Sequence, residues 1–285
     1  MNFSLNTQSI VWDTFGGLEP AKPEWQEQVA YWEDYARKFF KSNGMEFHAE
    51  DSNVENWLMS DDRAPFVDMV RELLPKLAEA KENEQADAIL FAHWLPDIHL
   101  GTSVTNFAMH KLGLKDCLGF AISDRGLSAP FFAFDSLYKY LSKGRQRGLL
   151  IIADQKHAMY KSDIIQSLDP LNAACIVPID LGNTDGLGYV GYARQRVAAG
   201  SSPAQCLMDI TQGFGLAAKD TVFIGPEDVL RSVESAAGTI NTDTRLVCAA
   251  PFVELSKVTD LSLNHVLVCK DGDRLSALGF QGAPA

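Results

Sequence analysis

The chain has 285 residues, 46% hydrophobic and 22% charged, with a formal net charge of −12, a composition typical of a globular protein with a sizeable core. The acidic balance disfavours nucleic acid and anionic membrane as partners, and no apolar run approaches the roughly 20 residues that span a bilayer. Five scattered cysteines without a CxxC pair, and an N-terminus without a secretory pattern, predict a cytoplasmic protein with reduced thiols.

The first half of the chain alternates amphipathic stretches with short apolar runs. Helical spacing of apolar residues predicts helices at 23–41, 61–81, 103–112 and 129–143. We expect Pro75 to kink or break the second of these, and Gly113 and Gly144 to end the last two. Strands are predicted at 9–15, 86–92, 118–123, 148–154 and 173–179.

The second half repeats this alternation in a shorter form. Helices are predicted at 203–217 and 226–235, and strands at 221–224, 245–252, 265–270 and 274–280. Asp271-Gly272 between the last two strands is a strong hairpin signal. The pattern predicts an α/β protein with two related halves, residues 1–180 and a shortened 181–285.

One stretch of the first half carries a family resemblance. From Ala86 to Asp154 the order reads ADAILFAHWLPD, FAMHKLGL, GFAISDRGL, a helix ending YLSKG, and RQRGLLIIAD. This order resembles the first half of β-ketoacyl synthase III, a member of the thiolase superfamily. The resemblance implies a thiolase fold, with αβαβα layers and an active site between the two halves.

The resemblance also implies where a nucleophile would lie. These enzymes attack an acyl thioester with a cysteine at the N-terminus of a buried helix, where the helix dipole lowers the thiol pKa. Counting back from Gly144, that position falls on Gly126 or Leu127, and neither can attack a thioester. We call residues Asp124, Arg125, Gly126 and Leu127 the vacated turn.

The family's other catalytic positions lack the expected side chains. The strand end that should carry a histidine corresponds to 222–228, which contains neither His nor Asn, and no Gly-Asn turn is recognisable at 241–245. The chain therefore resembles a non-catalytic subunit, most closely the small subunit of heterodimeric 2-alkyl-4-quinolone synthases. The expected partner is a cysteine-bearing ketosynthase III-like subunit, in a heterodimer or heterotetramer that acts on acyl-CoA or acyl carrier protein. No cofactor is expected.

Two alternative functions remain open at this point. Cys117 begins a Cys-Leu-Gly-Phe motif and would be the nucleophile of a stand-alone acyltransferase or condensing enzyme; otherwise it packs as a small apolar residue. A binding module for acyl-CoA or a carrier protein is the other alternative, with basic residues at Lys139, Lys143, Arg145 and Arg147.

Three further features have a functional and a structural interpretation. His93, Asp97 and His99 have metal-ligand chemistry, but they fall in a turn that is structural in the family, so no metal is expected. Gly182, Gly186 and Gly188 lack the spacing of a nucleotide-binding loop. Arg125 either fills the old pocket, paired with Asp124 or a partner carboxylate, or is an exposed turn residue.

Overall fold

Two β-sheets form the body of the protein. The computed structural model describes residues 3–79, 86–183, 185–233 and 236–283. The five-stranded sheet has the order β2 (Val11–Phe15), β6 (Asn172–Asp180), β5 (Arg147–Asp154), β3 (Ala88–Ala92) and β4 (Leu118–Ile122). The six-stranded sheet has the order β1 (Ser4–Leu5), β7 (Leu187–Arg196), β11 (Arg274–Gln281), β10 (Asn264–Asp271), β8 (Thr221–Gly225) and β9 (Gly238–Asn241). The predicted boundary at 180/181 lies between the end of β6 and the start of β7, and among the described strands β1 joins the sheet that the later strands build.

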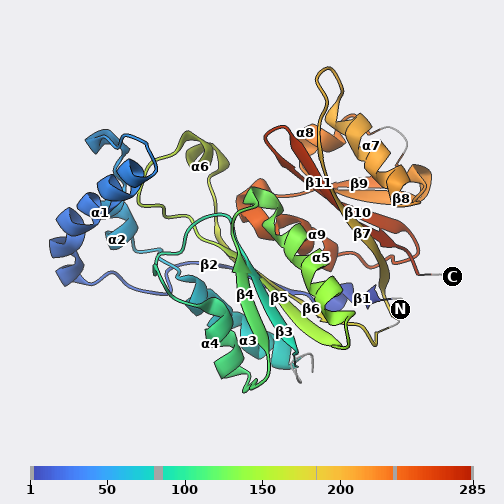
Figure 1. The fold of residues 1–285 in the computed structure, drawn as a ribbon, viewed down its shortest axis with the longest axis horizontal. Coiled ribbons are helices and arrows are strands. Elements are labelled where there is room, and N and C mark those ends of the chain that lie inside the picture. Colours follow the sequence, from blue (N-terminus) through green and yellow to red (C-terminus); the bar gives the residue numbers. More distant parts are fainter. Residues whose placement is uncertain (1–2, 80–85, 184, 234–235, 284–285) are drawn as a thin grey trace.

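Helices lie on both outer faces and between the sheets (Figure 1). The five-stranded sheet is covered outside by α3 (Phe66–Glu79) and α4 (Val104–Lys111), and the six-stranded sheet by α7 (Pro203–Gly213) and α8 (Glu227–Leu230). Helices α5 (Ala129–Leu141) and α9 (Ala250–Ser256) are buried between the sheets. The layers are therefore αβαβα, as predicted.

Side chains that alternate along a strand of the five-stranded sheet contact the helices on both of its faces. On β3, Ala88, Leu90 and Ala92 face the core that contains α5 and α9. Ile89 and Phe91 face α3 and α4. A strand buried on both faces has to be apolar throughout, which is why these runs show no polar alternation.

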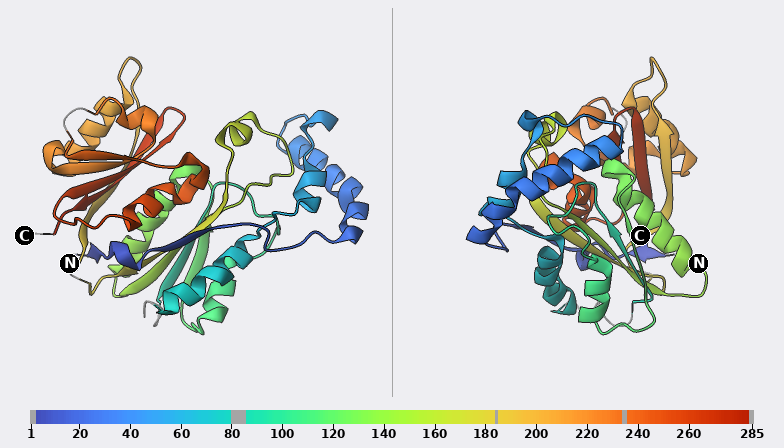
Figure 2. Two further views of the ribbon diagram at one scale, coloured as in Figure 1. Left: turned by 180° about the vertical axis from the view of Figure 1, so that it is seen from behind. Right: turned by 60° about the vertical axis from the view of Figure 1, so that its left-hand side comes forward.

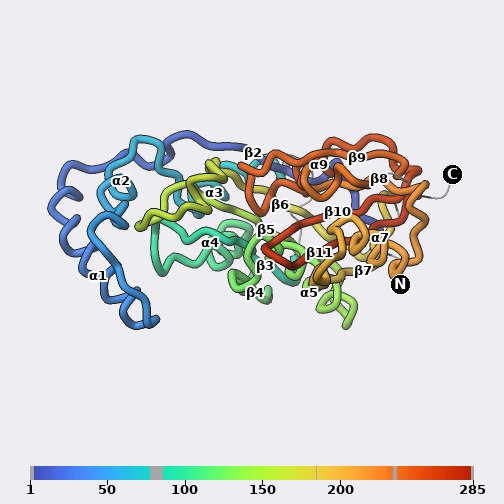
Figure 3. Tube along the Cα trace, turned by 90° about the horizontal axis from the view of Figure 1, so that it is seen from above, coloured from blue at the N-terminus to red at the C-terminus, as the bar shows by residue number. Residues whose placement is uncertain are grey.

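An N-terminal arm extends from one end of the body (Figures 2 and 3). It contains a 3-10 turn (Pro23–Gln28), α1 (Val29–Ser42) and α2 (Val54–Met59), so the predicted helix at 23–41 begins later than expected. Trp32 packs on Trp57 with ring centroids 5.1 Å apart, which joins the two helices. Two aromatic side chains of α1, Tyr31 and Phe39, are exposed.

The predicted strand at 245–252 is wrong. These residues form a 3-10 turn (Thr244–Ala249) that leads into α9. The start of α9, residues 250–253, is buried throughout and carries no polar side chain. A short apolar run without periodicity is equally consistent with a strand.

Other elements differ from the sequence prediction. Five elements of the structure were not predicted from the sequence: β1, β7, β9, α2 and the short α6 (Asp163–Leu168). Pro75 lies inside α3 without ending it. The predicted ends of two helices, at 80–81 and 235, lie outside the described residues.

The two buried helices are related by an internal repeat. Each begins with Ala-Pro-Phe, at 129–131 and at 250–252. Three residues before each start, the backbone has a positive φ: 57° at Gly126 and 50° at Val247. The rings of Phe131 and Phe252 meet edge to face, with centroids 5.9 Å apart. The strand–turn–helix unit that carries the vacated turn is thus duplicated, and the two copies face each other.

Candidate functional site

The vacated turn connects β4 to α5 at the boundary between the two halves. Gly126 opens a single 3-10 turn (Gly126–Ser128) that runs directly into the buried helix. Its φ of 57° lies in the left-handed region, which L-residues adopt only at a cost. The turn therefore places Gly126 just before the N-terminus of α5, and a glycine offers no side chain there.

A carboxylate from the second half fills the space beside this glycine. A Cβ at position 126 would overlap a carboxylate oxygen of Asp271 and lie 3.1 Å from its Cγ. Asp271 ends β10 at the hairpin with β11, whose turn residue Gly272 has a φ of 58°. The tight hairpin thus brings a negatively charged group to the place where the side chain of a nucleophile would begin.

A cavity of about 590 Å³ opens next to the vacated turn. Its lining comes from the turn, α6 (Asp163–Leu168), the segments after β8 and β9, the start of α9 and the β10–β11 hairpin. The lining residues are Leu127, Ile164, Ser167, Leu168, Pro226, Asp228, Thr242, Thr244, Val247, Ala250, Pro251, Val268, Cys269, Lys270 and Gly272. The lining is apolar around Leu127 and α9 and polar near β8 and β9.

The cavity contains little chemistry for acyl transfer. No histidine is among its lining residues, and β8 ends in Gly225 followed by Pro226 where the family resemblance implies a histidine. Asn241 pairs with Gly225 at the end of β9, but its neighbour Thr242, not Asn241, lines the cavity. The charged groups, Asp228 and Lys270, neutralise each other at 2.5 Å. A general base for a nucleophile is therefore missing from this lining.

Cys117 lies far along the strand from the vacated turn. It precedes β4, whereas the turn follows the other end of that strand, and its side chain packs against the cluster beneath α3 and α4. Burial, with a contribution from Asp87, raises the pKa of its thiol to about 11. This placement and this pKa are those of a packing residue and not of an activated nucleophile.

Cys248 is a thiol close to the vacated turn that the sequence analysis did not single out. Its Sγ is 3.9 Å from the carbonyl oxygen of Gly126, and its backbone N–H donates to Asp154 at 3.2 Å. Asp154 is fully buried and also accepts the N–H groups of Trp94 and Leu95. Burial and the neighbouring Asp154 raise the pKa of Cys248 well above its ordinary value, so the thiol stays protonated.

Arg125 covers one side of the vacated turn. Its guanidinium lies over the ring of Phe132, 4.4 Å from the centroid, and its Nε is 3.8 Å from a carboxylate oxygen of Asp124. The side chain is 34% exposed. Arg125 is therefore partly buried against α5 and not a freely exposed turn residue.

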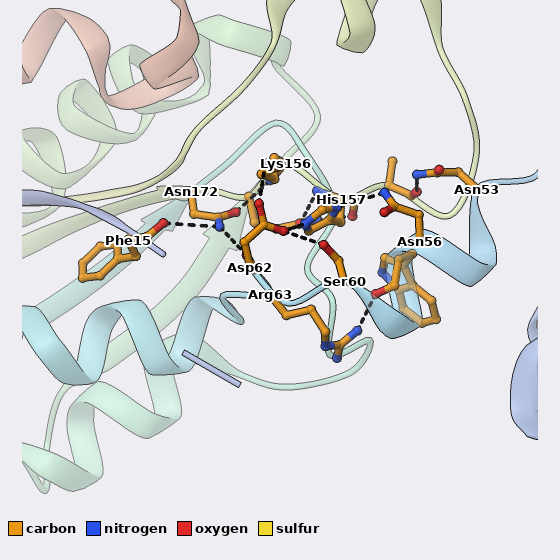
Figure 4. Close-up of polar contacts among 12 residues, drawn as sticks. Phe15, Asn53, Asn56, Ser60, Asp62, Arg63, Lys156, His157 and Asn172 are labelled. Carbon is orange, nitrogen blue, oxygen red and sulfur yellow. Dashed lines mark hydrogen bonds and ion pairs between the residues drawn. The ribbon is translucent and has the colours of Figure 1, made fainter. Parts of the chain in front are cut away.

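A second polar cluster surrounds Asp62 at the base of the arm (Figure 4). Asp62 accepts hydrogen bonds from Ser60 at 2.5 Å and His157 at 2.6 Å, and pairs with Lys156 at 2.5 Å. Although burial alone would raise it, the pKa of Asp62 is lowered strongly by these three partners.

This cluster contains the residue types of a catalytic triad in a different arrangement. Ser60 and His157 bind the same carboxylate oxygen, and the other ring nitrogen of His157 faces the side-chain amide of Asn56 at 3.3 Å. Among the described residues, no hydroxyl forms a hydrogen bond with the imidazole, so the arrangement lacks the serine–histidine contact that activates a nucleophile. The neighbouring backbone bond from Asn53 N–H to Met159 indicates a structural role, fastening the arm to the segment after β5.

The residues with metal-ligand chemistry in the sequence do not converge. Asp97 accepts the N–H of Phe66 at 3.0 Å, His99 contacts Glu19 at 3.0 Å, and His93 contacts the carbonyl of Leu95. Within the described ranges, no group of three or more His, Cys, Asp or Glu side chains could hold a metal ion.

The sequence as a whole matches no protein-family model and no curated protein. The fold, however, is similar to solved structures over nearly the whole chain. AbyA1, a tetronic acid condensing enzyme, superposes with a TM-score of 0.65 at 11% identity, covering 98% of this chain and 100% of its own. FabH from Pseudomonas aeruginosa PAO1 gives 0.62 at 13% identity and covers 100% of this chain and 99% of its own. OleA from Xanthomonas campestris, solved with lauric acid and lauroyl-CoA, gives 0.63 at 13% identity and 99% of both chains.

The chain has a thiolase fold. Its solved neighbours are ketosynthase III-like proteins, and at 11–13% identity the likeness extends to the fold alone. The cavity beside the vacated turn is lined by residues from both sides of position 180. Over the part of the chain that is described, no helix is long and apolar enough to cross a membrane.

Proposed function

We propose that this chain is the non-catalytic subunit of a ketosynthase III-like complex and pairs with a cysteine-bearing ketosynthase. The observation that carries the proposal is the carboxylate of Asp271, which occupies the space that a side chain at position 126 would need. The lack of a histidine in the cavity lining supports it. A stand-alone acyltransferase would depend on Cys117, whose place at the start of β4 argues against that role.

An unpaired strand edge supports the pairing. β4 is the edge strand of the five-stranded sheet, and it leaves two large apolar side chains, Leu118 and Phe120, 39% and 41% exposed. An edge with exposed apolar residues is prone to pair with another strand. We propose that β4 pairs with the same edge of the catalytic subunit, giving a heterodimer or a heterotetramer.

The product class is part of the same proposal. The similar structures include a tetronic acid condensing enzyme and an acyltransferase, ChlB3. We propose acyl condensation in specialised metabolism, alkylquinolone-like or polyketide-like, with acyl-CoA or an acyl carrier protein reaching the complex through the catalytic subunit. The resemblance of the vacated turn to the small subunit of 2-alkyl-4-quinolone synthases favours the alkylquinolone-like class.

Co-expression with the ketosynthase encoded next to this chain tests the pairing. Size-exclusion chromatography with mass determination should give one species that contains both chains. Phe120→Lys should abolish co-elution, because a charge would be buried at the edge-to-edge contact. Val190→Lys, at a 36% exposed position on β7 in the other sheet, is the matched control and should leave the complex intact. Separate elution of the two wild-type chains contradicts the proposal.

A further inference from the structure

Three side chains with unused hydrogen-bond donors lie on the inner face of the six-stranded sheet beside the vacated turn. Tyr192 and Arg194 are two residues apart on β7 and therefore point to the same face, where Tyr192 packs against the core between the sheets. Arg125 reaches this face from the start of α5, since its guanidinium lies over Phe132. The ring of Phe132 is in turn 6.3 Å from that of Tyr192.

Each of these three side chains has a buried polar atom without a hydrogen-bond partner. The atoms are Nε of Arg125, the hydroxyl of Tyr192 and Nε of Arg194. The Ser276 side chain lies near the Tyr192 hydroxyl, but the two do not have the geometry of a hydrogen bond. The carboxylate beside Arg125, that of Asp124, is 78% exposed and 3.8 Å from Nε, too far for a hydrogen bond. A buried donor left unpaired costs about 1–3 kcal/mol, so three at one place indicate an acceptor that the described residues do not provide.

Neighbouring carboxylates do not pair with these three donors. The Asp271 carboxylate lies beside Gly126, but among the described residues it forms no hydrogen bond or ion pair with Arg125 or Arg194. Asp135, on the adjacent face of α5, accepts the hydroxyl of Tyr189 at 3.0 Å and pairs with Lys139 at 2.7 Å. Arg196, two residues beyond Arg194, pairs with Asp273 at 2.6 Å. In the described part of the chain, Arg194 has no such ion pair. Arg194, which lies on the same face as Tyr192, is therefore the arginine of this strand that lacks a carboxylate partner among the described residues.

The chemistry of the three donors selects the ligand class. Guanidinium groups only donate, and burial raises the pKa of Tyr192, so its hydroxyl stays protonated and can donate too. A group that satisfies all three must accept several hydrogen bonds and carry negative charge, as carboxylates and phosphates do. The positive site is local, because the chain as a whole carries a charge of −12.

We propose that Arg125, Tyr192 and Arg194 form a binding site for an oxyanion, a carboxylate or a phosphate, beside the vacated turn. The site goes beyond the proposed pairing and does not depend on it, because all three residues belong to this chain. Its place next to Gly126 would hold an anionic group at the boundary between the halves.

Calorimetric titration of the purified full-length chain with malonate and with inorganic phosphate tests the site, with ionic strength held constant by sodium chloride. At least one anion should bind saturably, and Arg194→Gln and Tyr192→Phe should each weaken that binding about tenfold, the loss of one charge-assisted or hydroxyl bond. Arg231→Gln is the matched control, since Arg231 is 73% exposed and pairs with Glu227 on its own helix. It should leave binding unchanged.

The titrations distinguish a carboxylate site from a phosphate site, and both from the absence of a site. Binding of malonate alone assigns a carboxylate, and binding of phosphate alone assigns a phosphate. Tyr192→Phe keeps the ring and its packing, so a loss of binding in that variant does not come from misfolding. Failure of both anions to bind the wild-type chain overturns the proposal, as does equal binding in the wild-type and Tyr192→Phe chains.

Discussion

The contact between Gly126 and Asp271 predicts an unusual cost for the smallest possible side chain. Gly126→Ala forces an L-residue into the left-handed region, at about 1 kcal/mol. The new Cβ also overlaps the Asp271 carboxylate, which has to move, at roughly another 1–3 kcal/mol for an overpacked site. We therefore expect Gly126→Ala to lower the free energy of unfolding by about 2–4 kcal/mol, or Tm by roughly 4–8 °C.

Two further variants separate the two contributions. Gly113 has a φ of 68° and open space around its Cα, so Gly113→Ala reports the backbone cost alone, about 1 kcal/mol. Removing the carboxylate with Asp271→Ala should reduce the cost of Gly126→Ala to that same value. Urea denaturation of the single and double variants gives the coupling energy. Equal costs for Gly126→Ala with and without Asp271 would refute the claim that this carboxylate fills the nucleophile's place.

Other predictions concern the Asp62 cluster, Cys117 and the inter-helix contact. Because the pKa of folded Asp62 is lowered, its contribution to stability is present above the unfolded pKa and is lost as pH falls towards the folded one. Asp62→Asn should thus lower the free energy of unfolding by about 1 kcal/mol at pH 7, a modest value because the side chain is 40% exposed. In urea titrations, the difference in unfolding free energy from wild type should shrink below about pH 4. An unchanged difference at low pH would contradict the ion-pair assignment. With a thiol pKa of about 11, Cys117 should react with iodoacetamide at pH 7.5 roughly a hundredfold more slowly than an ordinary cysteine, as followed by peptide mass spectrometry, whereas a rapid reaction would reveal an activated thiol. Phe252→Ala, at a fully buried position, should cost about 3–5 kcal/mol, whereas Phe39→Ala, at a 49% exposed position on the arm, should change the unfolding free energy of the isolated chain little.

The sequence was sufficient for the strands and helices with clear end signals. Buried strands such as β5 are continuous apolar runs, and Gly113 and Gly144 follow the ends of α4 and α5 with positive φ. The segment that forms β7, LGYVGYARQR, was missed because two glycines and three polar residues mask its alternation. For α9, the repeated Ala-Pro-Phe at 250–252 was a usable signal, since proline is favoured in the first turn of a helix and excluded from a central strand.

The candidate site could be predicted only in part. The turn at Gly126 is local, so its place between a strand and a buried helix can be read from neighbouring residues. The positions of Asp271 and of the oxyanion donors on β7 depend on how the second half folds back onto the first. Such long-range packing leaves no periodic pattern in a single sequence, and the same holds for the proximity of Cys248 to the vacated turn.

Intact-mass spectrometry after incubation with an acyl-CoA tests the central claim most directly, using this chain alone and co-expressed with the neighbouring ketosynthase. We expect an acyl adduct on the partner's cysteine and an unchanged mass for this chain under both conditions. An acyl adduct on this chain, at Cys117 or at any other residue, would contradict the assignment of a non-catalytic subunit.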